Sequence, residues 1–446
     1  MRRARLVLMA LSLLLAGLMG IAHAAFRASD PGVRRGDPWA GMPLPGLMAG
    51  QLWFFNAGKQ AFEEAEGIMN GLGPRFNLNS CGGCHAQPAS GGTSPSHNPQ
   101  VDVIQTFPKN TLPSFITADG PVREARFKRK PDGTPDGGVH DLFVIDCGIT
   151  QEEFATQLAQ HNVIFRIPTP TFGSGLIEQI PDSAIAANQH TSLPQKAALG
   201  IGGRINHVTV SGDFNKNGND GTIARFGWKA QNKSLLLFTG EAYNVEMGIS
   251  NELFQTEREE ASACQFMTVP NDVTNTETLD LLGGLSDLEK FAFFMRFLAP
   301  PTPSPDTPGG AASIARGKSL FGKVGCAFCH TPMFHTGNST VEALRNKPVN
   351  VYSDLLLHNM GPNLADGVSQ GEAGPDEFRT APLWGLGQRI FFLHDGRTTD
   401  LLDAIQEHQS AGNTQYQRSE ANGVVINFRA LSEQQKQDLL NFLRSL

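Results

Sequence analysis

The chain has 446 residues, carries 36 Lys and Arg against 43 Asp and Glu, and has a formal net charge of −7. This acidic balance argues against nucleic acid or an anionic membrane as the main partner, because both repel negative charge. The length predicts two or three domains, and six cysteines are too few for a scaffold that depends on disulfides.

The N-terminal segment has the pattern of an export signal. Three arginines at positions 2, 3 and 5 precede an apolar run over 6–21, and an A-x-A site follows at 22–24. This pattern predicts a signal peptide over 1–24 that is cleaved near Ala24. A single membrane anchor is the alternative, which the shortness of the run disfavours. We therefore expect a periplasmic protein whose mature chain has no membrane span.

Two Cys-x-x-Cys-His motifs, at 81–85 and 326–330, carry the chemistry. Thiols three residues apart lie on one side of a helical turn, so each can bond one vinyl group of a haem while the adjacent His binds the iron. A zinc half-site or a dithiol redox pair is the alternative, which two copies behind an export signal argue against. The sequence therefore predicts two covalent c-type haems, attached through Cys81, Cys84, Cys326 and Cys329 and ligated by His85 and His330.

Two further features concern stability rather than catalysis. In an oxidising compartment Cys147 and Cys264 predict one disulfide, the alternative being two buried thiols. The loop from Asp213 to Gly218 begins like a calcium-binding EF-hand loop. Its twelfth position is Ala224 instead of a bidentate Glu, so an ordinary Asn- and Gly-rich turn is favoured over a calcium site.

A Pro-rich run over 299–311 predicts a linker. A predicted helix over 287–298, opened by a capping box at Ser286, precedes it, and a predicted helix over 312–323 follows it. A second capping box, with the pattern S-x-x-Q at Ser432, opens a predicted terminal helix. The predicted domains are an N-terminal haem domain over 25–298 and a C-terminal cytochrome c domain over 312–446.

The two parts repeat the same motifs in the same order. Pro-x-aromatic-Gly-x-Gly occurs at 170–175 and again at 382–387, and Trp228 occupies the repeat position of His394. We therefore expect a mainly α fold with two cytochrome c-like haem domains in tandem. The first is enlarged by loop-rich insertions around 100–165 and 176–224, whose Val, Ile and Phe content between turn residues permits some β structure.

Longer motifs add a family resemblance. Residues 79–85, 91–95, 353–361 and 379–385 resemble the di-haem oxidoreductase family, and the His-Asp-Gly-Arg run at 394–397 is similar to the wider bacterial dihaem cytochrome c peroxidase superfamily. The resemblance implies an exported peroxidase-like oxidoreductase, in which a C-terminal electron-transfer haem feeds an N-terminal substrate haem. It also implies a small oxidant such as hydrogen peroxide and a periplasmic electron donor or acceptor protein. The alternative is a non-catalytic dihaem electron-transfer protein, which two low-spin haems in the spectrum would indicate.

The sixth ligands of the irons decide between these functions. His408 is the predicted distal ligand of the C-terminal haem, because it shares an apolar helical face with Leu401 and Ile405. Met360 is the rival ligand, and a buried His bonded to backbone is the structural alternative. The resemblance implies that the N-terminal haem has a sixth position that is open or loosely held by His97. An ordinary exposed loop at His97 is the alternative.

The resemblance further implies a Trp between the haems and a Glu over the N-terminal haem, which here correspond to Trp228 and Glu246. A carboxylate can take a proton from peroxide and return it to the departing oxygen. The spacing between Trp228 and Glu246 is slightly shorter than in those enzymes, so Glu241 competes for the role. A solvated surface Glu and a core Trp are the structural alternatives.

Overall fold

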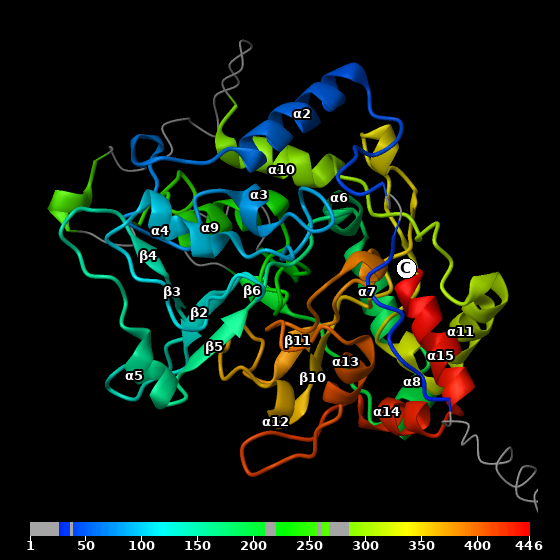
Figure 1. Ribbon diagram of the computed structural model, residues 1–446. Coiled ribbons are helices and arrows are strands. Elements are labelled where there is room, and N and C mark those ends of the chain that lie inside the picture. The colour runs from blue at the N-terminus through cyan, green and yellow to red at the C-terminus, as the bar shows by residue number, and fades with distance from the viewer. Residues whose placement is uncertain (1–25, 36–38, 210–219, 257–260, 267–284) are drawn as a thin grey trace, which may run out of the picture.

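The computed structural model describes residues 26–35, 39–209, 220–256, 261–266 and 285–446 (Figure 1). The predicted signal peptide and the loop from Asp213 to Gly218 lie outside the described residues. None of the described helices is long and apolar enough to cross a membrane.

Helices make up most of the regular structure, and the strands form small antiparallel sheets. The helices are α2 (Ala49–Glu63), α3 (Cys81–Cys84), α4 (Val103–Thr106), α5 (Phe154–Ala159), α6 (Ser174–Glu178), α7 (Asp182–Gln189), α8 (Leu193–Leu199), α9 (Leu235–Met247), α10 (Asp287–Phe297), α11 (Gly310–Val324), α12 (Gly361–Leu364), α13 (Leu401–Glu407), α14 (Asn422–Arg429) and α15 (Glu433–Arg444). The strands are β1 (Arg75–Phe76), β2 (Glu124–Phe127), β3 (Val139–His140), β4 (Phe143–Val144), β5 (Val163–Arg166), β6 (His207–Thr209), β7 (Asp220–Ile223), β8 (Phe334–His335), β9 (Pro348–Val349), β10 (Leu357–Asn359) and β11 (Glu377–Arg379).

A closely packed helix pair supports the first Cys-x-x-Cys-His motif. Helices α2 and α10 cross at Gly58, where an added Cβ would lie 2.1 Å from the carbonyl oxygen of Lys290. Only glycine allows this approach, since real side chains do not tolerate such a contact. One turn later Phe62 packs against Phe294 at a ring-centroid distance of 4.8 Å and meets the edge of His85 at 5.9 Å.

The same arrangement supports the second motif. Helices α11 and α15 cross at Gly317, where a Cβ would lie 2.0 Å from the carbonyl oxygen of Asp438. One turn later Phe321 contacts Phe442 at 5.5 Å and His330 at 6.3 Å. Figure 1 shows the two helix pairs in different parts of the molecule, one at the top and one at the right. Each pair thus places a phenylalanine beside the histidine of its motif.

Several local predictions are confirmed. Helices α10 and α15 both begin with a side-chain capping box, at Ser286 and Ser432, and α11 begins two residues before its predicted start. Cys147 and Cys264 form the predicted disulfide. The insertion around 100–165 contains the sheet β3-β2-β5, and the one around 176–224 contains the β6–β7 pair together with α7 and α8.

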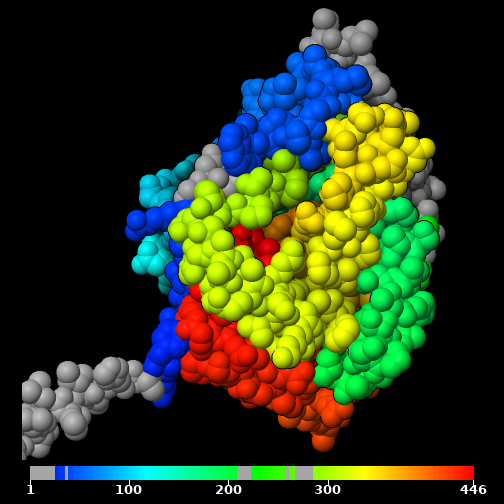
Figure 2. Space-filling view, turned by 90° about the vertical axis from the view of Figure 1, so that its right-hand side faces the viewer, coloured from blue at the N-terminus to red at the C-terminus, as the bar shows by residue number. Residues whose placement is uncertain are grey.

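The two parts of the chain are interlocked. Helix α8 of the second insertion packs on α14, and in Figure 2 this green segment lies beside the yellow-to-red C-terminal part. Residues 26–35 also pack there, because Arg444 Nη2 forms an ion pair with Asp30 at 2.6 Å and Ala28 lies in the C-terminal core. This segment therefore contacts the C-terminal part, although the predicted boundary groups it with the N-terminal domain.

Candidate active site

Each Cys-x-x-Cys-His motif faces its own cavity. The first cavity is lined by Cys81, Cys84 and His85. The second cavity is lined by Cys326, Cys329 and His330. Trp228 lines both cavities.

The two motif histidines have equivalent hydrogen bonds. His85 Nδ1 donates to the carbonyl oxygen of Gly92 at 2.9 Å, and His330 Nδ1 donates to that of Tyr352 at 3.0 Å. Because a carbonyl only accepts, the proton is on Nδ1 and the Nε2 lone pair remains for a metal. Burial lowers the pKa of His85, and burial together with the nearby His408 lowers the pKa of His330 to about 4. Both rings are therefore neutral at physiological pH, as ligation requires.

Buried guanidinium groups provide a test of whether haem fits. Arg379 and Arg389 line the second cavity, and within the described ranges neither forms an ion pair with a carboxylate. Burial and a neighbouring arginine lower the pKa of each to about 10. In the first cavity the buried Nε of Arg166 has no hydrogen-bond partner in the described part of the chain. Arg166 is paired with Asp366 at 2.6 Å and offers only this Nε donor. Arg379 and Arg389, unpaired among the described residues, offer cations that fit the propionate carboxylates of haem. Together with the thiols and the Nε2 atoms they make the donor set compatible with one haem in each cavity.

Carboxyl groups gather in the first cavity. Glu246 and Glu241 come from α9, and Glu124 comes from β2. Burial and the adjacent Glu124 charge raise the pKa of Glu246 well above its usual value. Burial also raises the pKa of Glu241, although Asn232 donates a hydrogen bond to it. Glu124 behaves differently. Burial acts to raise its pKa, but the guanidinium groups of Arg126 and Arg166 lower it overall.

Trp228 lies between the cavities and contacts His394, the residue at its predicted repeat position. The two rings meet edge to face at 6.3 Å, and Trp228 Nε1 donates to the carbonyl oxygen of Ile167 at 2.9 Å. The backbone links are reciprocal: Ile167 N–H donates to the His394 carbonyl at 2.8 Å, and Arg379 N–H donates to the Trp228 carbonyl at 2.9 Å. Burial lowers the pKa of His394 to about 4, so this ring is neutral.

The second cavity contains both candidate sixth ligands. His408 caps α13 and lines the cavity with Leu401 and Ile405, as the predicted shared face requires. Its Nδ1 donates to the carbonyl oxygen of Ala404 at 2.6 Å, which leaves Nε2 as an acceptor. Met360 lines the same cavity.

His97 does not line the first cavity. Its side chain is 61% exposed and lies 3.1 Å from Asp102. The neighbouring Asn98 is fully buried and bonds the carbonyl oxygen of Pro121, so Asn98 takes the inward position of this loop. The structure therefore does not bring His97 to the other predicted site residues.

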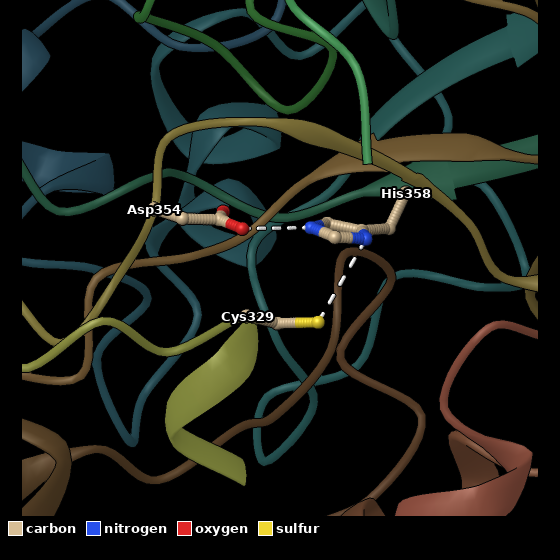
Figure 3. A group of neighbouring side chains, drawn as sticks. All are labelled: Cys329, Asp354 and His358. Carbon is tan, nitrogen blue, oxygen red and sulfur yellow. Dashed lines mark hydrogen bonds and ion pairs between the residues drawn. The ribbon is translucent and has the colours of Figure 1, made fainter. Parts of the chain in front are cut away.

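His358 is a site residue to which the sequence analysis assigned no role. It lines the second cavity between two carboxylates, with Nε2 at 2.9 Å from Asp354 and Nδ1 at 2.7 Å from Glu420 (Figure 3 shows the Asp354 side). Burial acts to lower the pKa of His358, but Cys329 and Asp354 raise it well above its usual value. Asp354 and His358 are four residues apart within the motif over 353–361, and this spacing could have identified the pair from the sequence.

Cys329 Sγ lies 3.7 Å from His358 Nδ1, and Cys329, Asp354 and His358 together could hold a metal ion. The same sulfur is the predicted attachment point of the second haem. One thiol cannot serve both purposes, so we assign His358 to the surroundings of the second haem site.

One comparison with known proteins identifies the family of this chain. Residues 143–446 match the family model described as "Di-haem oxidoreductase, putative peroxidase". No curated protein matches the chain. A structure of Kuenenia stuttgartiensis hydrazine synthase under xenon is 21% identical, with a TM-score of 0.23, over 36% of this chain and 55% of that chain. A MauG-like protein associated with microbial copper homeostasis is 15% identical, with a TM-score of 0.37, over 95% of both chains. At these TM-scores neither structure carries an argument about this chain.

Proposed function

Since the chain belongs to the di-haem oxidoreductase family, we propose that it is an exported dihaem c-type cytochrome that reduces hydrogen peroxide. The observation that carries this proposal is the difference between the two cavities. The first is lined by three carboxyl side chains and by Met247 and Met295, but among the described residues by no histidine other than His85. The second is lined by His408, a second candidate imidazole ligand, in addition to the motif histidine His330, and by Met360. A haem with two protein ligands can only exchange electrons, whereas one with a free position can meet substrate.

The repeated packing supports two haem domains in tandem. Gly58 and Phe62 on α2 correspond to Gly317 and Phe321 on α11. In both pairs the residues contacted on the partner helix are also four positions apart. The disulfide between Cys147 and Cys264 favours an oxidising compartment, in agreement with a signal peptide and a periplasmic location.

The reaction consumes hydrogen peroxide, two electrons and two protons and yields two water molecules. When bound, haem supplies the iron that passes electrons to the O–O bond. The chain supplies the rest: Glu246 holds a proton at the first cavity, Asn77 orients its carboxyl through a 2.9 Å hydrogen bond, and Trp228 shortens the gap between the cavities. A periplasmic one-electron donor protein would supply the two electrons, relayed through a C-terminal haem held by Cys326, Cys329 and His330.

The spectrum tests the function directly. We expect one high-spin and one low-spin ferric haem, together with peroxide consumption when a reduced cytochrome or a small one-electron donor is added. Both redox states should be recorded, because a conditional sixth ligand would change with reduction. Two low-spin haems in both states and no turnover would favour the non-catalytic electron-transfer protein.

Covalent attachment is tested by altering one motif at a time. Cys81→Ala with Cys84→Ala should leave one haem per chain on a denaturing gel, and so should Cys326→Ala with Cys329→Ala. Only the fourfold variant should lose the haem stain completely. Two covalent haems in either double variant would refute the assignment.

The distal ligand is tested by comparing two substitutions. His408→Ala should abolish the bis-imidazole signal of the low-spin haem, because its Nε2 faces the second cavity. Met360→Ala should leave that signal intact and serves as the control. The reverse pattern would assign the ligand to Met360.

Trp228→Phe tests the path between the haems. Phenylalanine keeps an aromatic ring but cannot be oxidised transiently, so peroxide binding should be retained while electron delivery between the haems slows. Rapid-mixing spectroscopy separates the two steps. Trp53→Phe is the matched control, because Trp53 is half exposed on α2 and lines neither cavity. Equal interhaem rates in the two variants would remove Trp228 from the path.

A further inference from the structure

A second carboxyl group contacts the proposed acid of the first cavity. Glu124 and Glu246 both line the cavity, and their carboxyl groups lie within hydrogen-bond reach of each other. They are 122 positions apart in the sequence, on β2 and α9, so no local motif relates them.

The surrounding structure fixes both groups. Asn77 holds Glu246 twice, since its backbone N–H donates to the Glu246 carbonyl at 2.7 Å and its Nδ2 donates to Oε2 at 2.9 Å. Arg126 Nε donates to Glu124, and Arg126 Nη1 is itself anchored on the Gly137 carbonyl at 2.7 Å. Arg166 lies directly opposite Glu124 in the β2–β5 register.

Two carboxylates in hydrogen-bond contact cannot both be ionised, so one proton remains between them. The charged neighbours decide where it resides. Arg126 and Arg166 face Glu124 and favour its ionised form. Burial and the negative charges of Glu124 and Asp141 disfavour the ionised form of Glu246. The hydrogen-bond donor to Glu246 in this set is the neutral side chain of Asn77. The thiols of Cys81 and Cys84 also face Glu246, and Glu241 faces Arg126 and Glu124.

We propose that Glu124 and Glu246 form one acid–base pair that shares a single proton, with Glu124 as the accepting carboxylate and Glu246 as the donating acid. The proposal rests on the peroxidase function above and deepens it. One carboxyl acting alone must first take a proton and then return it. A pair that already holds one proton is equipped for both transfers at once.

Glu124 takes the proton from one peroxide oxygen while Glu246 gives its proton to the other. The O–O bond breaks as it accepts two electrons from the periplasmic donor, and the oxygen that received the proton leaves as water. Two protons from solvent then convert the other oxygen, now fully reduced, to a second water. The hydrogen bond between the carboxyls then returns the proton from Glu124 to Glu246, so the pair is unchanged.

The test uses infrared spectroscopy of the ferric holoprotein as a function of pH, besides turnover. The wild type should show the C=O band of a protonated carboxyl group at neutral pH, and Glu246→Gln should lose it. In Glu124→Gln the same band should titrate away at lower pH, because the neighbouring negative charge is gone and the pKa of Glu246 falls. Glu124→Asp keeps that charge, so its midpoint should stay closer to the wild type.

Turnover should change in parallel. We expect Glu124→Gln to lower kcat/KM for peroxide by about 10²-fold, at the lower end of the range for general acid–base catalysis. Its remaining activity should rise with pH as Glu246 ionises, whereas activity of the wild type should fall at high pH. Glu124→Asp should recover part of the loss.

Two results would overturn the pair. One is an unchanged titration midpoint in Glu124→Gln, and the other is a wild-type spectrum without a band that Glu246→Gln removes. The comparison of the wild type with Glu246→Gln tests the pair even if Glu124→Gln does not fold. A wild type that does not reduce peroxide would refute the proposed function, while the infrared titration would still report on the pair.

Discussion

Replacing Glu246 with Gln is expected to slow peroxide reduction by about 10²–10⁴-fold, the usual contribution of a positioned acid–base group. Glutamine has nearly the same shape and can still accept the hydrogen bond from Asn77 at 2.9 Å, so the cavity should be preserved. What it cannot do is hold a transferable proton. The loss should therefore appear in kcat and in kcat/KM together, because the group acts in the transition state.

Glu241→Gln is the comparison that discriminates between the two glutamates of α9. Glu241 lines the same cavity but bonds Asn232 instead of a second carboxyl. We expect its effect on turnover to be far smaller, with both haem spectra unchanged in each variant. A large loss in Glu241→Gln with normal turnover in Glu246→Gln would transfer the acid–base role to Glu241. Normal turnover in both would favour an electron carrier.

Replacing Asp366 with Asn is expected to lower the free energy of unfolding by about 3–5 kcal/mol, the range for breaking a buried ion pair from one side. Asp366 has no exposed side-chain surface and pairs with Arg166 at 2.6 Å and with Lys229 at 3.1 Å. Asparagine would leave both buried cations without an ion-pair partner among the described residues. Arg166 and Lys229 both precede the Pro-rich run over 299–311, whereas Asp366 follows it, so this contact also fixes the two parts of the chain to each other.

The loss of unfolding free energy in Asp366→Asn should become smaller as the pH rises. Burial lowers the pKa of Lys229 to about 8, and Asp366 opposes that shift. Without Asp366 the pKa of Lys229 falls further, so the unfolded state binds more protons and stability rises with pH. The difference between variant and wild type should therefore be smaller at pH 9 than at pH 7.

Denaturant unfolding of the holoprotein at both pH values measures this effect. Asp146→Asn is the control, because the Asp146–Lys109 pair is exposed and should contribute less than about 1 kcal/mol. Equal stabilities of the two variants would contradict the assigned role of Asp366.

The features that the sequence determined by itself are local. The Cys-x-x-Cys-His motifs, the capping boxes at Ser286 and Ser432 and the helices that follow them depend on residues within one or two turns, so spacing alone reveals them. The family resemblance also came from short motifs, and the match over residues 143–446 confirms it.

Tertiary structure alone decided the contacts between residues far apart in the chain. His97 was a candidate ligand by resemblance and His408 by helical spacing. Asn98 occupies the buried position beside His97, whereas the C-terminus of α13 places His408 at its cavity. Likewise, no spacing could show that Glu420 would face His358, or that β2 would bring Glu124 to Glu246. Burial and charge at such positions depend on which distant segments pack together, and the sequence pattern around one residue does not contain that information.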